Sequence, residues 1–415
     1  MLTTVDQFLL SFLQLGKYYM KRVMFRSAVI IVDEIHLLNP KMLSLLLQFF
    51  RTFIPIYKFK VLFMSATFSN ALMRIITEYI PSIKSIDFSE GYKELLRVKY
   101  TIDTLDRLID DIDKIARLAK SKKVLVVANT VESAVLIYRR LEKKVPRSRL
   151  ILLHGKFMYR DRLTKEQDID SLEARPHVLV TTQVCEVSLD VSYGVMFTEI
   201  APLPSLVQRF GRVNRYGKVT EKDNVYIYKE YRKNYSERYY PYEEKDMFLS
   251  KQILNELFPI KSEYDLIKKY NEVESYDELR RRMNEAVGEH DFRALWENDS
   301  RTAYFFSFKL DEEKARQQLL LEFRDSFTVN VLPHPECIEN HGVKRDLNRL
   351  LNGLTTVDAS TYGKFRQILM ALRGYLVSIS AWQASKHNMD RIKGFPIFKP
   401  DDLLYSSIYG FVKRN

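Results

Sequence analysis

The stretch Val178–Gly217 reads VLVTTQVCEVSLDVSYGVMFTEIAPLPSLVQRFGRVNRYG, and the fold of the whole chain can be worked out from it. An apolar run at residues 177–180 predicts a buried parallel strand, and Val195–Thr198 predicts the neighbouring strand. Polar residues follow the first run, at the carboxyl end of the predicted strand, where open α/β sheets place their ligand sites. These residues are Thr181, Thr182, Gln183, Glu186 and Asp190.

A row of arginines follows the second predicted strand. Two prolines break the chain there, and Ser205 can cap a new helix. This helix carries Gln208, Arg209, Arg212 and Arg215, whose spacing places one amide and three guanidinium groups on one face. The ordinary explanation of such a row is a solvated basic surface. Beside a ligand-site architecture, planar guanidinium donors also suit a polyphosphate.

The segments TTQVCEVSLDV and APLPSLVQRFGRVNR resemble the fifth and sixth motifs of superfamily 2 helicases. Joined in this order, they resemble more narrowly the CRISPR-associated helicase of type I interference systems. The resemblance implies an ATP-dependent motor that moves 3′ to 5′ on single-stranded DNA, with ATP and Mg²⁺ as cofactors. It also implies that Gln208, Arg209, Arg212 and Arg215 are catalytic residues acting at the phosphates, and that Asp190 contacts the nucleotide.

Composition is that of a globular protein with room for two or three domains in 415 residues. A formal charge of +12 favours a polyanionic partner. No apolar run reaches the length of a membrane span and no signal peptide is recognisable, so we expect a cytoplasmic protein. Cys185 and Cys337 have no partner pattern, so we expect two buried, unreactive thiols and neither a disulfide nor a zinc site.

An acidic pair follows the predicted internal strand Ala28–Val32. Asp33 can hold a nucleotide-bound Mg²⁺ through water, and Glu34 can act as the general base that polarises the attacking water. An acidic turn without function is the alternative. With Ile35 and His36 the pair resembles the DExH box of the helicases, and only that resemblance implies a coupling role for His36.

Two shorter motifs lie on either side of the DExH box. The segment TTVDQFL near the start resembles a motif through which the first RecA-like domain touches DNA, which implies a DNA contact at Thr4; a simple helix cap is the alternative. A helix is predicted over Lys41–Arg51 and a strand over Lys60–Met64. That strand ends in Ser65-Ala66-Thr67, which resembles the third helicase motif, and the hydroxyl groups of Ser65 and Thr67 can relay between the γ-phosphate and the domain seam.

Strands and helices alternate from about residue 98, which predicts a second parallel sheet. Asn129 and Thr130 end a predicted strand and precede a helix whose amino end could bind phosphate, and they resemble the fourth helicase motif. His154 ends the next strand and resembles an element that lies near the DNA. With Thr181 and Thr182, these residues are the candidate DNA contacts of this domain; for His154, a packed histidine is an equal alternative.

No catalytic motif is recognisable in the remaining residues of the sequence. The tyrosine-rich stretch after residue 233 interleaves basic and aromatic residues, which can follow a nucleic acid or cover a domain seam. Helices are predicted over residues 247–257, 276–287, 312–323 and 365–372, a strand over 326–332 and a strand–turn at the carboxyl end. We therefore predict an α/β fold: an incomplete first RecA-like domain (1–96), a second (97–232) and a mostly helical accessory domain (233–415).

A phosphate-binding loop, GxxxxGK[ST], is missing from the sequence. The first domain should therefore show an open, apolar sheet edge, as in a truncated or split product, and the chain alone should have little ATPase activity. The resemblance implies an RNA-guided CRISPR complex as partner and a histidine-aspartate (HD) nuclease on another chain or domain, since His290-Asp291 alone cannot build one. The alternatives are another DExH translocase, for example in DNA repair, and an inactive DNA-binding scaffold.

Overall fold

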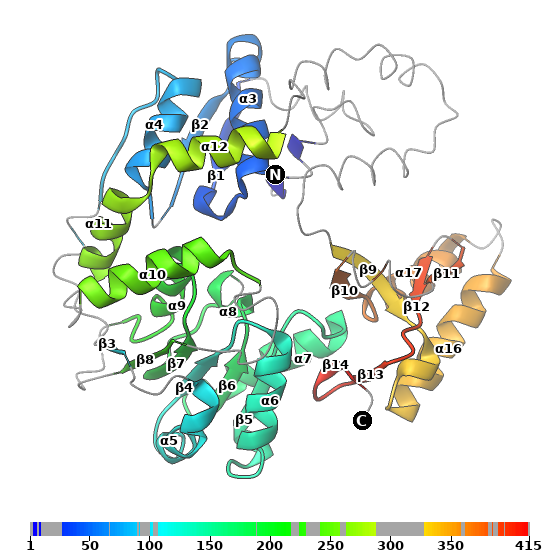
Figure 1. The fold of residues 1–415 in the computed structure, drawn as a ribbon. Coiled ribbons are helices and arrows are strands. Elements are labelled where there is room, and N and C mark those ends of the chain that lie inside the picture. Colours follow the sequence, from blue (N-terminus) through cyan, green and yellow to red (C-terminus); the bar gives the residue numbers. More distant parts are fainter. Residues whose placement is uncertain are drawn as a thin grey trace. The chain divides into compact units, whose positions relative to one another are not determined.

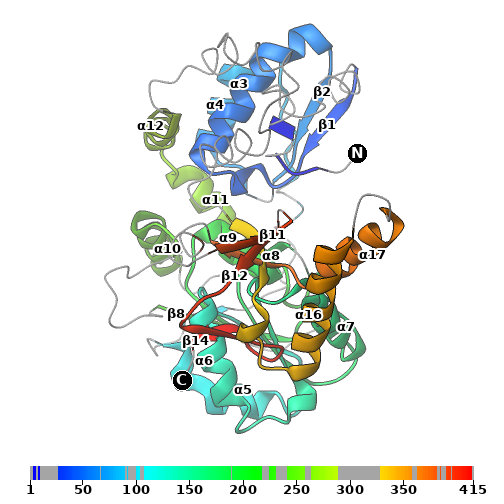
Figure 2. The same cartoon turned by 90° about the vertical axis from the view of Figure 1, so that its right-hand side faces the viewer.

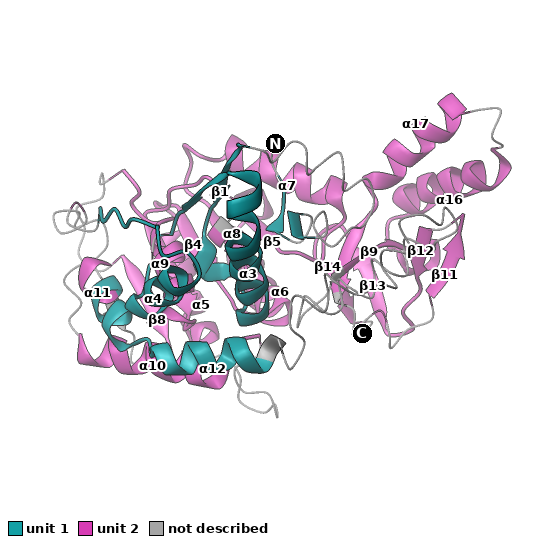
Figure 3. Cartoon of the chain, turned by 90° about the horizontal axis from the view of Figure 1, so that it is seen from above, with its two compact units in different colours: residues 1–90, 267–327 teal, residues 91–266, 328–415 magenta. Residues whose placement is uncertain are grey.

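The computed structural model describes residues 3–5, 8–9, 27–65, 67–88, 91, 100–102, 107–187, 189–216, 224–229, 241–257, 263–287, 328–357, 362–380, 384, 389–393 and 395–413. Contacts divide the chain into two compact units, which Figure 3 shows in different colours. The first unit comprises residues 1–90 and 267–327, and the second comprises residues 91–266 and 328–415. Neither unit is therefore one continuous segment.

This division differs from the predicted boundaries at 96 and 232. Helix α12 (Tyr276–Val287) packs on the first unit, whereas residues 328–415 belong to the second. The periodicity of a helix shows which of its faces is apolar, but it does not show which distant surface that face covers. Periodicity therefore predicts a single domain after residue 233, whereas in the structure these residues are divided between the two units.

Two parallel strands form the sheet of the first unit, β1 (Val29–Val32) and β2 (Lys60–Phe63). They are connected by the 3-10 turn η1 (Ile35–Leu37) and the long helix α3 (Pro40–Tyr57), and α4 (Asn70–Tyr79) follows. The side chain of Asn39 accepts a hydrogen bond from the Met42 amide and so caps α3. Both predicted strands are confirmed. The helix runs further than the predicted end at Arg51, because Phe53 continues its buried face.

Helix α12 completes the core of the first unit. Met283 is 1% exposed and lies in one cluster with Phe8, Phe49 and Phe50. At the start of α12, the Tyr276 hydroxyl donates to Glu78 Oε1 at 2.5 Å. A segment more than 200 residues later in the chain therefore belongs to this core.

A six-stranded parallel sheet forms the centre of the second unit, in the order β3-β8-β7-β4-β6-β5 (Figure 1). The strands are β3 (Tyr100–Ile102), β4 (Val124–Val127), β5 (Leu150–Leu153), β6 (Val178–Thr181), β7 (Val195–Glu199) and β8 (Val225–Tyr228). The connecting helices are α5 (Ile112–Leu118), α6 (Val131–Leu141), α7 (Tyr159–Ser171), α8 (Val184–Val187) and α9 (Leu203–Phe210), with short 3-10 turns at Leu108–Asp111 and Arg147–Arg149. This is the predicted RecA-like arrangement.

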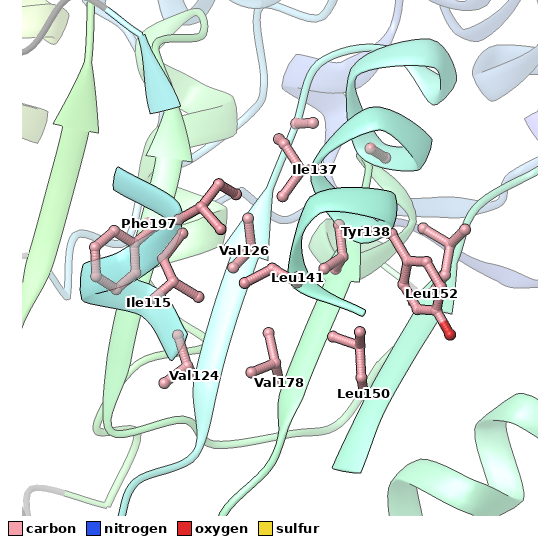
Figure 4. Packing of buried hydrophobic residues seen from close by; sticks show 14 of the residues in the cluster. Ile115, Val124, Val126, Ile137, Tyr138, Leu141, Leu150, Leu152, Val178 and Phe197 are labelled. Carbon is pink, nitrogen blue, oxygen red and sulfur yellow. The ribbon is translucent and has the colours of Figure 1, made fainter. Parts of the chain in front are cut away.

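The inner strands of this sheet are buried along their whole length. Figure 4 shows Val124, Val126 and Val178 packing beneath Ile137 and Leu141 of α6. Parallel sheets of α/β proteins are covered on both faces, so their strands read as continuous apolar runs. The strands were predictable from the sequence for this reason.

The carboxyl-terminal part combines helices with a small mixed sheet. Its elements are α10 (Glu244–Glu256), α11 (Glu263–Val273), β9 (Thr328–Pro333), η5 (Pro335–Cys337), α16 (His341–Thr356), α17 (Tyr362–Arg373), β10 (Val377–Ser380), β11 (Met389–Ile392), β12 (Phe395–Phe398), β13 (Leu403–Ser406) and β14 (Gly410–Lys413). Helix α17 corresponds to the predicted helix over 365–372, and α16, which was not predicted, lies beside it in Figure 2. The sheet β10-β9-β12-β11 and the hairpin β13–β14 add more strand than was predicted. The predicted helix over 312–323 lies outside the described residues.

No helix in the described ranges is both long and apolar enough to cross a membrane. Both cysteines are buried and free, as expected. Burial raises the pKa of the Cys185 thiol to about 12, which keeps it protonated and unreactive at neutral pH.

Candidate functional site

The acidic pair of the first unit lies where strand β1 ends. Asp33 is exposed, and its Oδ1 accepts the amide of Glu34 at 3.0 Å. Glu34 itself adopts a left-handed backbone with φ of 50°. For a residue other than glycine this conformation costs free energy and persists only where the surrounding structure fixes it, as at ligand sites. The turn therefore presents both carboxylates at the carboxyl edge of the β1–β2 sheet.

A hydrogen-bond network joins this turn to the end of the neighbouring strand. His36 Nδ1 lies 2.6 Å from Ser65 Oγ, which in turn donates to the Thr67 carbonyl at 2.8 Å. Since the hydroxyl proton of Ser65 points to Thr67, we assign a proton to His36 Nδ1, which donates to Ser65. Burial lowers the pKa of His36 to about 4, although Asp33 partly opposes the shift. His36 is therefore a neutral link between the two strand ends at pH 7.

The donor set of the first unit fits a magnesium ion held mainly by nucleotide phosphates. No group of three His, Cys, Asp or Glu side chains that could hold a metal occurs in the described residues. Mg²⁺ at phosphates needs only one or two protein carboxylates and retains several waters. Asp33 supplies one exposed carboxylate. Close to the network, Thr67 Oγ1 is buried with no hydrogen-bond partner among the described residues, so it is open to a ligand.

Arg209 is the centre of a buried network in the second unit. Its side chain is 0% exposed, and all five of its N–H donors have acceptors. Nε donates to Glu186 Oε1 at 2.8 Å, Nη1 to Thr198 Oγ1 at 2.9 Å and to the Glu199 carbonyl at 3.0 Å, and Nη2 to Asn129 Oδ1 at 3.0 Å and to the Tyr242 hydroxyl at 2.9 Å. The prediction that Arg209 acts at a phosphate is therefore wrong for this conformation, because no donor remains for a ligand.

The arginine row is not one helix face. Helix α9 ends at Phe210, and Tyr193 and Val213 form an isolated parallel bridge that turns the chain toward the sheet. Arg212, half-buried in the turn, donates to the Glu186 carbonyl, and the exposed Arg215 pairs with Asp190. The spacing argument fails after residue 210 because backbone pairing with Tyr193 replaces the helix. Gln208, on the last turn of α9, is buried at 8% exposure.

The four predicted DNA contacts at strand ends have buried side chains. Asn129 uses both ends of its amide, accepting from Arg209 and donating from Nδ2 to the Ile200 carbonyl at 2.7 Å. Thr130 caps α6 by accepting the Ser133 amide. Thr181 and Thr182 are 0% and 4% exposed. The structure does gather these residues at the carboxyl edge of the sheet, but it directs their side chains inward, so they are corrected to structural roles.

His154 is likewise a structural residue. It is 0% exposed, its Nε2 donates to the Tyr409 carbonyl at 3.0 Å, and its Nδ1 accepts the Lys156 amide at 3.2 Å. The hairpin β13–β14 covers it so closely that a Cβ on Gly410 would come within 2.7 Å of the imidazole. The prediction of a DNA contact is therefore wrong. Thr4, by contrast, is exposed, and its carbonyl accepts the Phe8 amide.

Three contributors to the second-unit network were not predicted. Glu199 accepts the Asn129 amide at 2.6 Å, Thr198 binds Arg209, and the Tyr242 hydroxyl provides the fifth acceptor. Glu199 could have been predicted as a member of the network, because its carboxylate lies at the end of a buried strand. Nothing distinguished Tyr242 from the other tyrosines in its stretch of sequence.

Burial of His154 predicts that the second unit loses stability in acid. Its pKa is lowered to about 3 by burial, below the ordinary 6.5, so the unfolded state binds the extra proton between these values. The contribution is complete above pH 6.5 and is lost as the pH falls toward 3, by about 2 kcal/mol at pH 5. Urea unfolding at pH 7 and pH 5 measures this loss. His154→Gln, which cannot titrate, should reduce the difference by that amount, and an equal difference in both proteins would contradict the prediction.

The fold defines the class of protein: an α/β protein with RecA-like parallel-sheet domains. Residues 120–218 match the family model described as CRISPR-associated nuclease/helicase Cas3, C-terminal.

Relatives and solved structures agree with this match. The putative CRISPR-associated nuclease/helicase Cas3 of Methanocaldococcus jannaschii is 35% identical over 216 residues, which cover 46% of this chain and 28% of the relative. The crystal structure of T. fusca Cas3-ADP superposes with a TM-score of 0.69 at 17% identity, over 99% of this chain and 57% of that one. A CRISPR RNA-guided surveillance complex in its pre-nicking state gives a TM-score of 0.64 at 16% identity, over 99% of this chain and 60% of that one.

Residues 120–218 and the matched relatives thus show that the chain is similar to the CRISPR-associated Cas3 helicases. It spans 28% of the length of the Methanocaldococcus relative and little more than half of the two superposed chains. At 16–17% identity the superpositions establish the fold alone.

Proposed function

We propose that the chain is the greater part of the motor of a type I CRISPR interference system, which uses ATP and Mg²⁺ to translocate 3′ to 5′ on single-stranded DNA. An RNA-guided complex delivers the target DNA, and an HD nuclease on another domain or chain degrades it. The observation that carries the proposal is the Asp33–Glu34 turn, joined through His36 to Ser65 on the neighbouring strand end. Its similarity to CRISPR-associated nuclease/helicases supports the CRISPR assignment.

The residues of the first unit would carry out hydrolysis as follows. Glu34 accepts the proton of the attacking water as general base, which requires its carboxylate to be ionised and close to that water. Asp33 would hold a nucleotide-bound Mg²⁺, and that ion would supply positive charge at the phosphates. Binding of nucleotide would alter the hydrogen bond between Ser65 and His36. The neutral imidazole can transmit this alteration through hydrogen bonding, without a change of charge.

The second unit would contribute Arg212 and Arg215. Arg212 donates to the Glu186 carbonyl, and Arg215 donates to Asp190. Both side chains are more exposed than that of Arg209, and the Arg215–Asp190 pair lies at the surface, where a phosphate can replace it. Arg209 holds Glu186, whose carbonyl accepts a hydrogen bond from Arg212, instead of touching the nucleotide. A guanidinium placed on the transferred phosphate stabilises the transition state, and hydrolysis is coupled to closure and opening of the domains on the strand.

An ATPase assay with single-stranded DNA tests this proposal. The isolated 415-residue chain should show little or no turnover, because GxxxxGK[ST] is not in its sequence. The same chain, combined with a polypeptide that supplies this loop, should hydrolyse ATP in a DNA-stimulated manner. Robust DNA-stimulated hydrolysis by the pure, isolated chain would contradict the expectation, and no hydrolysis in any combination would favour a DNA-binding scaffold.

Association with CRISPR RNA separates the proposed system from a DNA-repair translocase. Affinity purification of the tagged chain from the cells that make it should recover CRISPR RNA and the proteins bound to that RNA. A nuclease activity in the purified material is expected as well. Recovery of repair proteins without CRISPR RNA would support the alternative.

A further inference from the structure

A cavity lies in the second unit, at the amino edge of its six-stranded sheet. Its volume is about 690 Å³, within the range of roughly 300–1,000 Å³ that small-molecule sites occupy. Lys123 and Gly194 line it, and they directly precede β4 and β7. Figure 4 shows Val124 and Val178, the paired first residues of β4 and β6, at this end of the sheet. We call this space the amino-edge cavity.

The amino-edge cavity is separate from the network around Arg209. That network lies at the carboxyl edge of the sheet, where Glu199 ends β7 and Asn129 follows β4. Strands of four or five residues are roughly 13–17 Å long, so the two edges are a strand length apart. A ligand of this cavity is therefore distinct from anything bound at the carboxyl edge.

A buried hydrogen bond fixes one aromatic wall of the cavity. Tyr193 lines the cavity and is 2% exposed. His177 Nδ1 lies 2.8 Å from the Arg175 carbonyl, which can only accept, so we assign the proton to this nitrogen. His177 Nε2 therefore accepts from the Tyr193 hydroxyl at 2.9 Å. The Lys123 ammonium lies 5.9 Å from the centroid of the ring that this bond holds in place.

Groups of both charges line the cavity, and they come from different elements. Lys122 and Lys123 precede β4, whereas Asp170 lies in the last turn of α7 and Glu173 follows that helix. In the part of the chain that the structure describes, the Lys123 ammonium makes no hydrogen bond or ion pair, and neither do the carboxylates of Asp170 and Glu173. One cation and two anions are therefore available to a ligand.

Tyr216 adds an exposed aromatic ring to this set. It lies in the chain that follows α9, lines the cavity and is 65% exposed. Aromatic rings beside basic groups stack on nucleobases. Lysines bind phosphate as point charges, and carboxylates accept hydrogen bonds from the hydroxyl groups of ribose. The three kinds of side chain at this cavity therefore match the three parts of a ribonucleotide.

We propose that the amino-edge cavity binds a ribonucleoside 5′-phosphate. The base stacks on Tyr216, and the phosphate meets Lys122 and Lys123. The ribose hydroxyl groups donate to Asp170 or Glu173. An inorganic anion would leave the carboxylates unused, and a polyamine would leave the lysines unused. The inference does not depend on the proposed function, because the ATP of the motor is expected at the carboxyl edges of the sheets.

Isothermal titration calorimetry of the full chain with AMP, GMP, CMP and UMP tests the proposal. We expect saturable binding of at least one of them. Tyr216→Ala and Lys123→Met should each weaken it about tenfold, through loss of stacking and of a charged hydrogen bond. Lys143→Met, at an exposed lysine after α6, should leave affinity unchanged. Since Lys123 is half-buried, an unchanged circular dichroism spectrum of Lys123→Met checks that the variant folds.

The carboxylates separate recognition of ribose from simple attraction of an anion. Removal of two negative charges in Asp170→Asn/Glu173→Gln would strengthen binding of a phosphate held by charge alone. Recognition of ribose predicts the opposite, an affinity lowered about tenfold. The 2′,3′-dideoxy form of the bound nucleotide should bind the wild-type chain about tenfold more weakly than the ribonucleotide, and the double substitution should not weaken it further.

Photoaffinity labelling locates the ligand, and an RNA probe identifies its source. An azido derivative of the bound nucleotide should crosslink to residues 170–174 or 214–216. A 5′-phosphorylated RNA trinucleotide with the same first base should bind more tightly than the mononucleotide if the site takes the end of an RNA strand, and more weakly if it takes a free nucleotide. Either order supports the site.

Four results would overturn the inference. They are no saturable binding of any of the four nucleotides, equal affinity for the ribose and dideoxyribose forms, tighter binding by Asp170→Asn/Glu173→Gln, and crosslinks confined to other segments. Crosslinks confined to residues 33–65 would place the nucleotide at the proposed ATP site of the first unit. Binding at the amino-edge cavity in a chain that never hydrolyses ATP would leave this inference standing while the proposed function fails.

Discussion

Arg209→Met should lower the free energy of unfolding of the second unit by about 3–5 kcal/mol, the loss expected when one partner of a buried ion pair is removed. The substitution would leave the carboxylate of Glu186, which is 6% exposed, without its cation. It would also leave acceptors on Thr198, Asn129 and Tyr242 without their donor. Urea unfolding followed by far-ultraviolet circular dichroism at pH 7 measures this change.

Two comparisons separate this structural role from a role at the phosphate. Arg140→Met, on the exposed side of α6, should change the unfolding free energy by no more than about 0.5 kcal/mol. Arg209→Lys should be destabilising as well, because an ammonium has three donors and no planar fork to satisfy five acceptors. If Arg209→Met kept wild-type stability and lost only ATP hydrolysis, the result would instead support a role for Arg209 at the nucleotide phosphates.

Glu34→Gln should lower the turnover number of DNA-stimulated ATP hydrolysis by about 10²–10⁴-fold, the range typical for loss of a general base. The measurement uses the chain together with the polypeptide that supplies the phosphate loop. Nucleotide affinity should remain within a few fold, because glutamine keeps the size and hydrogen-bonding capacity of the side chain. The left-handed backbone at residue 34 is retained, so the turn itself should fold as before.

A matched substitution controls for the loss of charge. Glu285→Gln removes an exposed carboxylate from α12, where Glu285 pairs with Arg281, and should leave turnover unchanged. If Glu34→Gln hydrolysed ATP at the wild-type rate, Glu34 would not be the general base. The interpretation of the turn as a catalytic site would then be wrong.

Much of the fold was predictable because buried parallel strands leave a simple signal. The apolar runs at β4, β5, β6 and β7 lie within one or two residues of the predicted strands. The strand ends were predictable too, since a polar residue after an apolar run marks the carboxyl edge of a sheet. An open, apolar edge of the first sheet was expected from the missing loop, and in the described residues β1 pairs only with β2, with Val29 and Ile31 exposed.

The direction of side chains at those strand ends was not predictable in the same way. Asn129, Thr130, Thr181 and Thr182 lie at the expected edge, yet they hydrogen-bond inside the protein. A polar residue at a strand end can serve a ligand or satisfy another buried group, and its local sequence is the same in both cases. His154 is the clearest example, because its partner Tyr409 lies 255 residues later.

The sequence by itself determined the class of fold, the positions of the strand ends and the acidic pair, because these depend on local periodicity and residue type. Only the tertiary structure decided which arginine is buried and which two remain accessible. Arg209 meets Glu186, Asn129 and Tyr242 from 23, 80 and 33 residues away, and Arg212 leaves the helix because Tyr193 pairs with the chain beside it. Periodicity fixes how a side chain points from its own helix, whereas burial depends on groups that the folded chain brings from elsewhere.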